Sequence, residues 1–502
     1  MPTSDNGSAN GPDKDIQALA KGGRTNVFGF LLRLAARIPF LFIAGRYYGP
    51  EALGRFAYAI LVVEFVAQLA TLGLRRGLAE VLSREEKPAA HILADALLIG
   101  LFASAAGAVL LIAVPQAMFP NSRINELDRF LPLVIFAIVL TDISLSALAY
   151  RFDIASTVRA RAVVEPWTIS IAALGLYYYS PRDGLILSYV IAMVAAMLTA
   201  LWPLWRSYGT PRGWRPHPAT LIAMARRNMP LAAADAAEWG SRRLDLAILG
   251  LFASPAIVGI YYVAQQVASL PQKLKTSFDP ILGPVITRNL KEKSYKEIAR
   301  QVGQVGFWII AAQAGIALAL GIPGEAVMGL VGPEFVGGTG AVAFLLAAEV
   351  AAATAVVSEG ALVYIARHRN LLISLGMLAV QTALSIAFIF AVDYLPVKES
   401  LRGLFQAAAV ACALMFALGL ASIVKAKLLA KLLDAPISIW RWPLAAAIAI
   451  ASLLGIGATY LPEWAELIIG IPIILGAYSW VIWTKGFGED DRVLFRKAKK
   501  AD

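Results

Sequence analysis

The sequence has little of what builds a disulfide scaffold, a metal site or an ordinary soluble domain. It holds one cysteine, Cys412, so no disulfide can form within the chain. Its three histidines lie far apart and show no metal-ligand spacing. Charged residues make up only 16% of the 502 residues, against about 25% in soluble domains. We therefore expect no metal site.

Motifs for covalent chemistry and nucleotide hydrolysis are also missing. No G-x-x-x-x-G-K-[ST] loop occurs, which excludes an ATPase, and no serine nucleophile elbow is found. The glycine-rich stretch GLVGPEFVGGTG at 329–340 is not followed by a lysine, so a flexible loop is the better interpretation. The sequence predicts no enzyme and no cofactor.

Apolar residues dominate what is present, at 59% of the chain with a mean hydropathy of +0.67. A membrane-spanning helix needs about 20 mostly apolar residues. The sequence therefore predicts an all-α polytopic membrane protein with about fourteen spans, at 25–47, 52–74, 91–114, 129–150, 160–180, 184–205, 226–252, 256–284, 300–322, 338–366, 370–392, 402–424, 441–460 and 464–484.

Lysine and arginine are distributed unevenly between the predicted loops. With the N-terminus in the cytoplasm, 32 of the 45 basic residues fall on the cytoplasmic side, 7 on the opposite side and 6 inside spans. This bias predicts that both termini are cytoplasmic. It also indicates that the basic residues behind the formal charge of +11 contact anionic membrane lipids and do not bind nucleic acid.

An internal repeat divides the predicted spans. At an offset of 205 residues, GPEALGRFAYA (49–59) aligns with SPAIVGIYYVA (254–264), matching Pro50 with Pro255 and Gly54 with Gly259. The same offset aligns Arg37 with Arg242 and shifts the chain by six spans, which keeps the membrane orientation. We expect two six-helix lobes plus two C-terminal helices, with a disordered cytoplasmic tail (1–24), an N-lobe (25–205), a cytoplasmic linker (206–225), a C-lobe (226–424), extra helices (425–484) and a basic cytoplasmic tail (485–502).

Charged residues inside spans are the candidate functional residues. One arginine at the centre of a membrane helix costs about 2.5–3.5 kcal/mol. Residues four apart share a helical face, so Arg33 and Arg37 point to one side of the first span. Guanidinium suits phosphate oxygens through paired hydrogen bonds. We expect an anionic headgroup to bind Arg33, Arg37, Arg242, Arg243 and Lys273.

Carboxylates inside spans allow several roles. They could couple transport to a proton or sodium gradient, pair with the arginines, or only hold helices together. Glu238 and Arg242 are four residues apart and can pair on one face. The sequence does not separate these roles for Glu64, Asp235, Glu238, Asp245 and Glu349.

Three stretches, taken in order, resemble the polysaccharide (oligosaccharide) flippases of the multidrug/oligosaccharidyl-lipid/polysaccharide exporter superfamily. They are GRYYGPEALGRFAYAILVVEFVAQLATLGLRRGLAEVLSR (45–84), DLAILGLFASPAIVGIYYVAQQV (245–267), and VGPEF (331–335) with ALVYIARHRNLLI (361–373). The resemblance covers nearly the whole chain, including the number of spans.

The resemblance implies a V-shaped pair of six-helix lobes with a cationic central cavity and alternating access. The implied cargo is a polyprenyl-diphosphate-linked oligosaccharide, moved from the inner to the outer leaflet of a bacterial inner membrane for surface polysaccharide (O-antigen, capsule or exopolysaccharide). The further partners expected are a polysaccharide polymerase and other assembly proteins. The alternatives are a multidrug exporter of the same superfamily and a membrane glycan polymerase or ligase.

Overall fold

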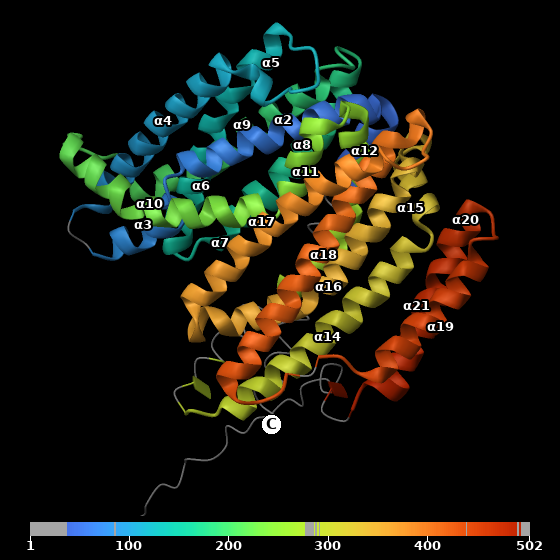
Figure 1. The fold of residues 1–502 in the computed structure, drawn as a ribbon. Coiled ribbons are helices and arrows are strands. Elements are labelled where there is room, and N and C mark those ends of the chain that lie inside the picture. The colour runs from blue at the N-terminus through green and yellow to red at the C-terminus, as the bar shows by residue number, and fades with distance from the viewer. Residues whose placement is uncertain are drawn as a thin grey trace, which may run out of the picture. The chain divides into compact units, whose positions relative to one another are not determined.

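The computed structural model describes residues 38–84, 87–276, 286, 289–290, 292–437, 439–488 and 491–492, and for 273–276 it describes the backbone alone. Within these ranges the chain consists of helices joined by turns, without a β-strand (Figure 1). The predicted all-α, multi-span architecture is confirmed. Contacts divide the described residues into two compact units, one ending at Tyr262 and one beginning at Val263.

The N-terminal unit contains the helices up to the start of α12. They are η1 (Ala44–Tyr48), α2 (Gly49–Ala70), α3 (Leu74–Ser83), α4 (Ala89–Ala113), η2 (Pro115–Ala117), α5 (Glu126–Phe130), η3 (Leu131–Leu133), α6 (Val134–Tyr150), α7 (Ile154–Thr157), η4 (Val158–Val164), α8 (Glu165–Tyr177), α9 (Gly184–Tyr208), α10 (Pro218–Ser241), α11 (Leu244–Phe252) and the first part of α12 (Pro255–Thr276). Thus α10 and α11 belong to this unit.

The C-terminal unit contains the rest of α12 and the helices that follow it. They are α14 (Tyr295–Gly321), α15 (Gly324–Val331), η5 (Pro333–Gly338), α16 (Thr339–Ile365), α17 (Arg367–Val392), α18 (Glu399–Leu433), α19 (Trp442–Ala458), α20 (Glu463–Ala465), η6 (Glu466–Gly470), α21 (Ile471–Val481) and η7 (Ile482–Gly486). The predicted lobe and tail boundaries stay predictions.

Helices long and apolar enough to cross a membrane occur in both units. Among the described residues they number nine, at Ile38–Ser83, Ala89–Ala113, Asp128–Tyr150, Gly184–Tyr208, Tyr295–Gly321, Pro333–Ile365, Arg367–Val392, Glu399–Leu433 and Glu463–Gly486. The apolar helix Trp442–Ala458 is shorter. Helices also occupy most of the predicted spans 160–180 and 226–252, as η4 with α8 and as α10 with α11. Of the predicted span 256–284, the structure describes residues up to 276, and these belong to α12.

A glycine lies between the first two predicted spans, 25–47 and 52–74. Gly49 has φ 77° and ψ 178°, a conformation that costs glycine little because it has no Cβ. Pro50 then occupies the first turn of α2, where its missing N–H breaks no helical hydrogen bond. The Gly-Pro pair therefore ends η1 and starts α2.

The predicted span 226–252 is not one helix. α10 ends at Ser241, Arg243 has φ −129° and ψ 1°, and α11 starts at Leu244. Gly240 immediately precedes the break, and glycine is about 1 kcal/mol less favourable than alanine inside a helix. The break places Arg242 and Arg243 at a junction between two helices.

Small residues let the long helices of the C-terminal unit pack closely. α16 packs against both α14 and α18, and α17 packs along α18 (Figure 1). Many of the buried residues of these helices are alanines, including Ala348 and Ala352 on α16 and Ala411 and Ala417 on α18. Small residues are typical of membrane helix interfaces, because no hydrophobic driving force acts between helices in lipid.

Candidate functional site

The predicted site residues are distributed over both units. Arg33 and Arg37 lie outside the described residues, as does the side chain of Lys273, whose backbone belongs to α12. Glu349 lies on α16 of the C-terminal unit and is 8% exposed. The other six residues lie in the N-terminal unit, five of them on α10, on α11 or at the junction between these helices, and the sixth, Glu64, on α2.

Three arginines surround two carboxylates on α10. Arg76 of α3 reaches Asp235 through Nε at 2.7 Å and Glu238 through Nη2 at 2.6 Å. Arg242 Nη2 lies 3.0 Å from Glu238 Oε1, which confirms the predicted i,i+4 pair. Arg75 Nη2 lies 3.9 Å from Asp235. We call Arg75, Arg76 and Arg242 the arginine cluster.

The arginine cluster carries one positive charge more than its carboxylates neutralise. Its three side chains are 41%, 46% and 48% exposed, whereas Asp235 is buried beneath them. A guanidinium has five N–H donors, and these ion pairs use only some of them. The remaining donors are accessible to a ligand with several acceptor oxygens, such as a phosphate.

Glu64 forms a second polar contact next to the junction. Its Oε1 accepts a hydrogen bond from Tyr189 Oη at 3.1 Å, and its Oε2 lies 3.8 Å from Arg243 Nη2. The Arg243 guanidinium stacks over the Trp239 ring at 5.7 Å, and Trp239 packs against Phe65. Arg243 therefore connects α11 to α2, and Glu64 is held between an arginine and a tyrosine.

A partly exposed group of charged residues that sequence reasoning missed lies close by. Arg161 pairs with Asp142 and, through Nη1 at 2.9 Å, with Glu165. Sequence reasoning places Arg161 among the cytoplasmic loop charges. The spacing of Arg161 and Glu165, four residues apart at the start of a span, is the signal that could have revealed this pair. Tyr189 of α9 contacts Glu64, and Met193, four residues later on α9, contacts Arg161, so both charge groups face one part of this helix.

Local backbone geometry explains how Arg161 reaches its partners. Arg161 lies in the π-helical segment η4, which is directly followed by Glu165 and Pro166. Proline has no N–H for the normal helical bond, and a wider turn before it relieves that conflict. Together Asp142, Glu165 and Glu64 carry three negative charges against Arg161 and Arg243. We call these three acids the carboxylate cluster.

Asp245 has a different environment from the other acids. It is 3% exposed in the first turn of α11, and it accepts a hydrogen bond from Tyr261 Oη at 2.8 Å. A carboxylate in the first turn also complements the positive end of the helix dipole. These contacts support a structural role for Asp245, holding α11 to α12.

The two aligned repeat segments touch each other reciprocally. A Cβ at Gly54 would lie 1.7 Å from the carbonyl oxygen of Pro255, and a Cβ at Gly259 would lie 2.0 Å from the carbonyl oxygen of Pro50. Each glycine therefore meets the proline that begins the other helix. The contact has the pattern of an isologous interface, in which residue i meets j and j meets i.

A buried cation lies on α18 of the C-terminal unit. Lys425 of α18 is 4% exposed; it donates to Glu359 Oε2 at 2.8 Å and to Ser374 Oγ at 3.1 Å. Within the described residues no group of three or more His, Cys, Asp or Glu side chains could hold a metal ion.

Known proteins provide an independent comparison. A family model described as "Polysaccharide biosynthesis protein" matches residues 43–315, more than half of the chain. No curated protein matches significantly. An inward-facing multidrug resistance MATE family transporter of the MOP superfamily aligns with TM-score 0.63 at 15% identity, over 80% of this chain and 99% of that one.

Two further solved structures have the same fold. A MOP superfamily transporter from Pyrococcus furiosus, described as having a reverse polarity of binding pocket, aligns with TM-score 0.56 at 14% identity, over 85% of this chain and 96% of that one. A point mutant of the Vibrio cholerae MATE transporter VcmN aligns with TM-score 0.51 at 14% identity, over 84% of this chain and 100% of that one. The chain belongs to the polysaccharide biosynthesis protein family, and its fold is similar to that of MOP superfamily transporters.

Proposed function

We propose that the protein is a flippase that moves a polyprenyl-diphosphate-linked oligosaccharide from the inner to the outer leaflet. The observation that carries this proposal is the arginine cluster, whose half-exposed guanidiniums keep free donors although two carboxylates neutralise part of their charge. Phosphate oxygens are the acceptors that a guanidinium matches best. The family match links the chain to polysaccharide biosynthesis.

The diphosphate is the part of the cargo that these residues would bind. In the proposal Arg242 and Arg243, at the break between α10 and α11, act together with Arg33, Arg37 and Lys273. Arg75 and Arg76 join this set because they share the carboxylates of α10 with Arg242. The lipid tail would stay in the bilayer while the headgroup passes the arginines.

The carboxylates would have two different roles. Asp235 and Glu238 hold the arginine cluster in place, because each contacts two of its members. The carboxylate cluster has one more negative charge than its two arginines, which suits coupling to a proton or a cation. Glu349, on α16, is the candidate coupling residue of the C-terminal unit.

The membrane arrangement in this proposal has fourteen spans, two six-helix lobes in a V shape and two C-terminal helices. Both termini lie in the cytoplasm of a bacterium, and the protein resides in the inner membrane. Its partners are the lipid-linked glycan, membrane lipids, a polysaccharide polymerase and other assembly proteins. Alternating access of the cationic cavity carries the headgroup across.

A translocation assay tests the proposal. The purified protein is reconstituted in liposomes with a fluorescent lipid-linked oligosaccharide, and the labelled headgroup reaching the other leaflet is measured by quenching. We expect translocation above that of empty liposomes and no export of cationic dyes. Dye export without movement of the lipid-linked oligosaccharide would instead support a multidrug exporter, and glycosyl transfer would support a polymerase or ligase.

A further inference from the structure

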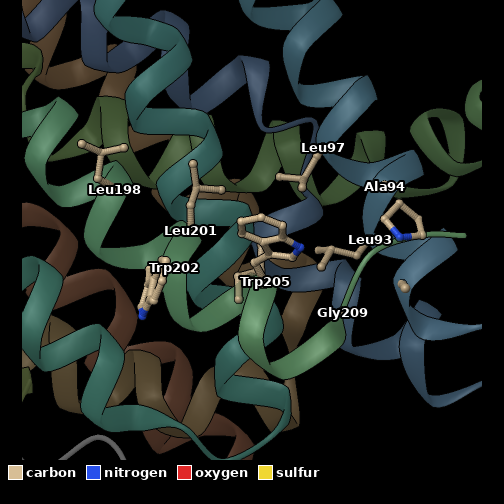
Figure 2. Close-up of a pocket in the computed structure, with 11 residues that line it drawn as sticks. Leu93, Ala94, Leu97, Leu198, Leu201, Trp202, Trp205 and Gly209 are labelled. Atoms are coloured by element: carbon tan, nitrogen blue, oxygen red, sulfur yellow. The ribbon is translucent and has the colours of Figure 1, made fainter.

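An apolar groove lies between α4 and α9 of the N-terminal unit. Its volume is about 500 Å³, and every residue that lines it is apolar. Leu93, Ala94 and Leu97 form the α4 side, and Leu198, Leu201 and Trp205 form the α9 side (Figure 2). In Figure 2 the indole of Trp205 points from α9 toward α4. The groove runs along about two turns of each helix, roughly 10 Å.

One end of the groove is closed by the chain that follows α9. Gly209, with φ +73°, ends the helix, and Pro211 then contributes to the groove wall. Two hydrogen bonds hold this segment against α4. His91 Nε2 donates to the carbonyl oxygen of Arg212 at 3.0 Å, and Trp214 Nε1 donates to Asp95 Oδ1 at 2.9 Å. The end of the groove is therefore a fixed part of the fold.

Basic side chains gather at this closed end. Arg206 follows the lining residue Trp205, Arg212 follows Pro211, and Arg215 lies three residues further on. All three are exposed. A nearby acid, Asp95, is buried and already contacts Trp214 and, at 3.8 Å, Lys87. In the part of the chain that the structure describes, the apolar groove thus ends beside a group of exposed basic side chains.

We infer that this groove binds one hydrocarbon chain of an anionic phospholipid, with the lipid phosphate at Arg206 and Arg212. Its apolar walls match a hydrocarbon chain, and its charged end matches a phosphate. The segment after α9 also leads directly into α10, which carries Asp235 and Glu238. A bound lipid would therefore stabilise the connection to the arginine cluster.

Photocrosslinking tests this inference on the full-length protein. The probe is phosphatidylglycerol with a diazirine in one acyl chain, and its attachment sites are mapped by peptide mass spectrometry. We expect labelling at 90–97 and 198–205, several-fold above that by the matching phosphatidylcholine probe. Ala94→Phe, which fills the groove, should lower this labelling at least fivefold. Ala106→Phe, at an exposed position of the same helix outside the groove, should leave it unchanged.

A charge variant tests the second half of the inference and leaves the apolar walls intact. Each basic residue near an anionic lipid surface contributes about 1 kcal/mol, equivalent to about fivefold in affinity. Arg206→Gln with Arg212→Gln should therefore remove most of the preference for phosphatidylglycerol over phosphatidylcholine. Equal labelling by both probes, or labelling unaffected by Ala94→Phe, would contradict the inference. Displacement of the probe by polyprenyl phosphate, and not by unlabelled phosphatidylglycerol, would identify the cargo as the occupant and overturn it as well.

Discussion

The contact between the two repeat segments leads to a quantitative prediction. Replacing Gly54 by alanine puts a Cβ 1.7 Å from the backbone carbonyl of Pro255. Real Cβ atoms essentially never approach another heavy atom closer than 3.0 Å, so α2 and α12 must separate locally by at least 1.3 Å. The obstacle is backbone, and no side-chain rotation can relieve it. Overpacking of this kind costs about 1–3 kcal/mol or more.

The reciprocal geometry makes the double variant informative. Gly259→Ala requires a separation of at least 1.0 Å from the carbonyl oxygen of Pro50, where its Cβ would lie at 2.0 Å. The same movement relieves both clashes. We therefore expect the Gly54→Ala, Gly259→Ala double variant to cost little more than Gly54→Ala alone, a clear departure from additivity.

Thermal unfolding of the detergent-purified protein measures these effects. Gly175→Ala on α8 is the matched control, because nothing lies within 4 Å of its Cβ and alanine is the better helix former. We expect Tm to fall for Gly54→Ala and to stay level or rise slightly for Gly175→Ala. If Gly54→Ala were as stable as the control, or if the two repeat variants were additive, the reciprocal packing would be refuted.

Three further predictions concern charged groups. Arg161→Gln leaves Asp142 and Glu165 without their cation. Because these side chains are partly exposed, we expect the free energy of unfolding to fall by about 1–3 kcal/mol, and Arg161→Lys to restore part of it. An unchanged Tm would contradict the ion pairs. In the C-terminal unit, Glu359→Gln leaves the buried Lys425 without its carboxylate partner, whereas Lys425→Met leaves only a half-exposed carboxylate unpaired. We therefore expect Glu359→Gln to lower Tm more than Lys425→Met. A larger fall in Tm for Lys425→Met would argue against the burial of Lys425. Burial raises the pKa of Asp491, but hydrogen bonds from Arg441, the Gly488 amide and Trp308 outweigh burial and hold that pKa below its usual 3.8. Because the pKa is lower in the folded than in the unfolded protein, the ionised carboxylate stabilises the fold above about pH 4. This stabilisation is lost as the pH falls further. Proteolysis of the C-terminal segment should therefore accelerate below about pH 4 in wild type, and Asp491→Asn should be cleaved quickly at every pH.

Hydropathy and turn chemistry allowed much of the fold to be predicted. Long apolar runs identify the helices because a bilayer leaves backbone groups few alternatives to helical hydrogen bonds. The helix boundary at Gly49 and Pro50 falls between the first two predicted spans, and both residues have strong local preferences for such a boundary. The break at Arg242 was not predictable, because hydropathy averages over a whole span and a single glycine does not end every helix.

The site was predictable only in part, because pairing depends on contacts distant in sequence. The Glu238–Arg242 pair follows from i,i+4 spacing on one helix. Arg76 joins that pair from α3, 162 residues away from Glu238, and nothing local indicates this. Arg161 and Lys425 resemble loop charges in the sequence because they lie at the ends of apolar runs, yet both are paired with acids of neighbouring helices.

The central claim is that guanidiniums at the α10–α11 junction bind the diphosphate of the cargo. The most direct measurement is the translocation rate of a lipid-linked oligosaccharide in liposomes containing Arg242→Gln, compared with Arg402→Gln. The two arginines are matched, since Arg402 pairs with Asp393 at 3.6 Å and is 44% exposed, against 3.0 Å and 48% for Arg242. Loss of one charged hydrogen bond of about 1.5–3 kcal/mol predicts a fall of about tenfold to a hundredfold for Arg242→Gln. We expect Arg402→Gln to match wild type. Equal rates for Arg242→Gln and wild type would contradict the claim.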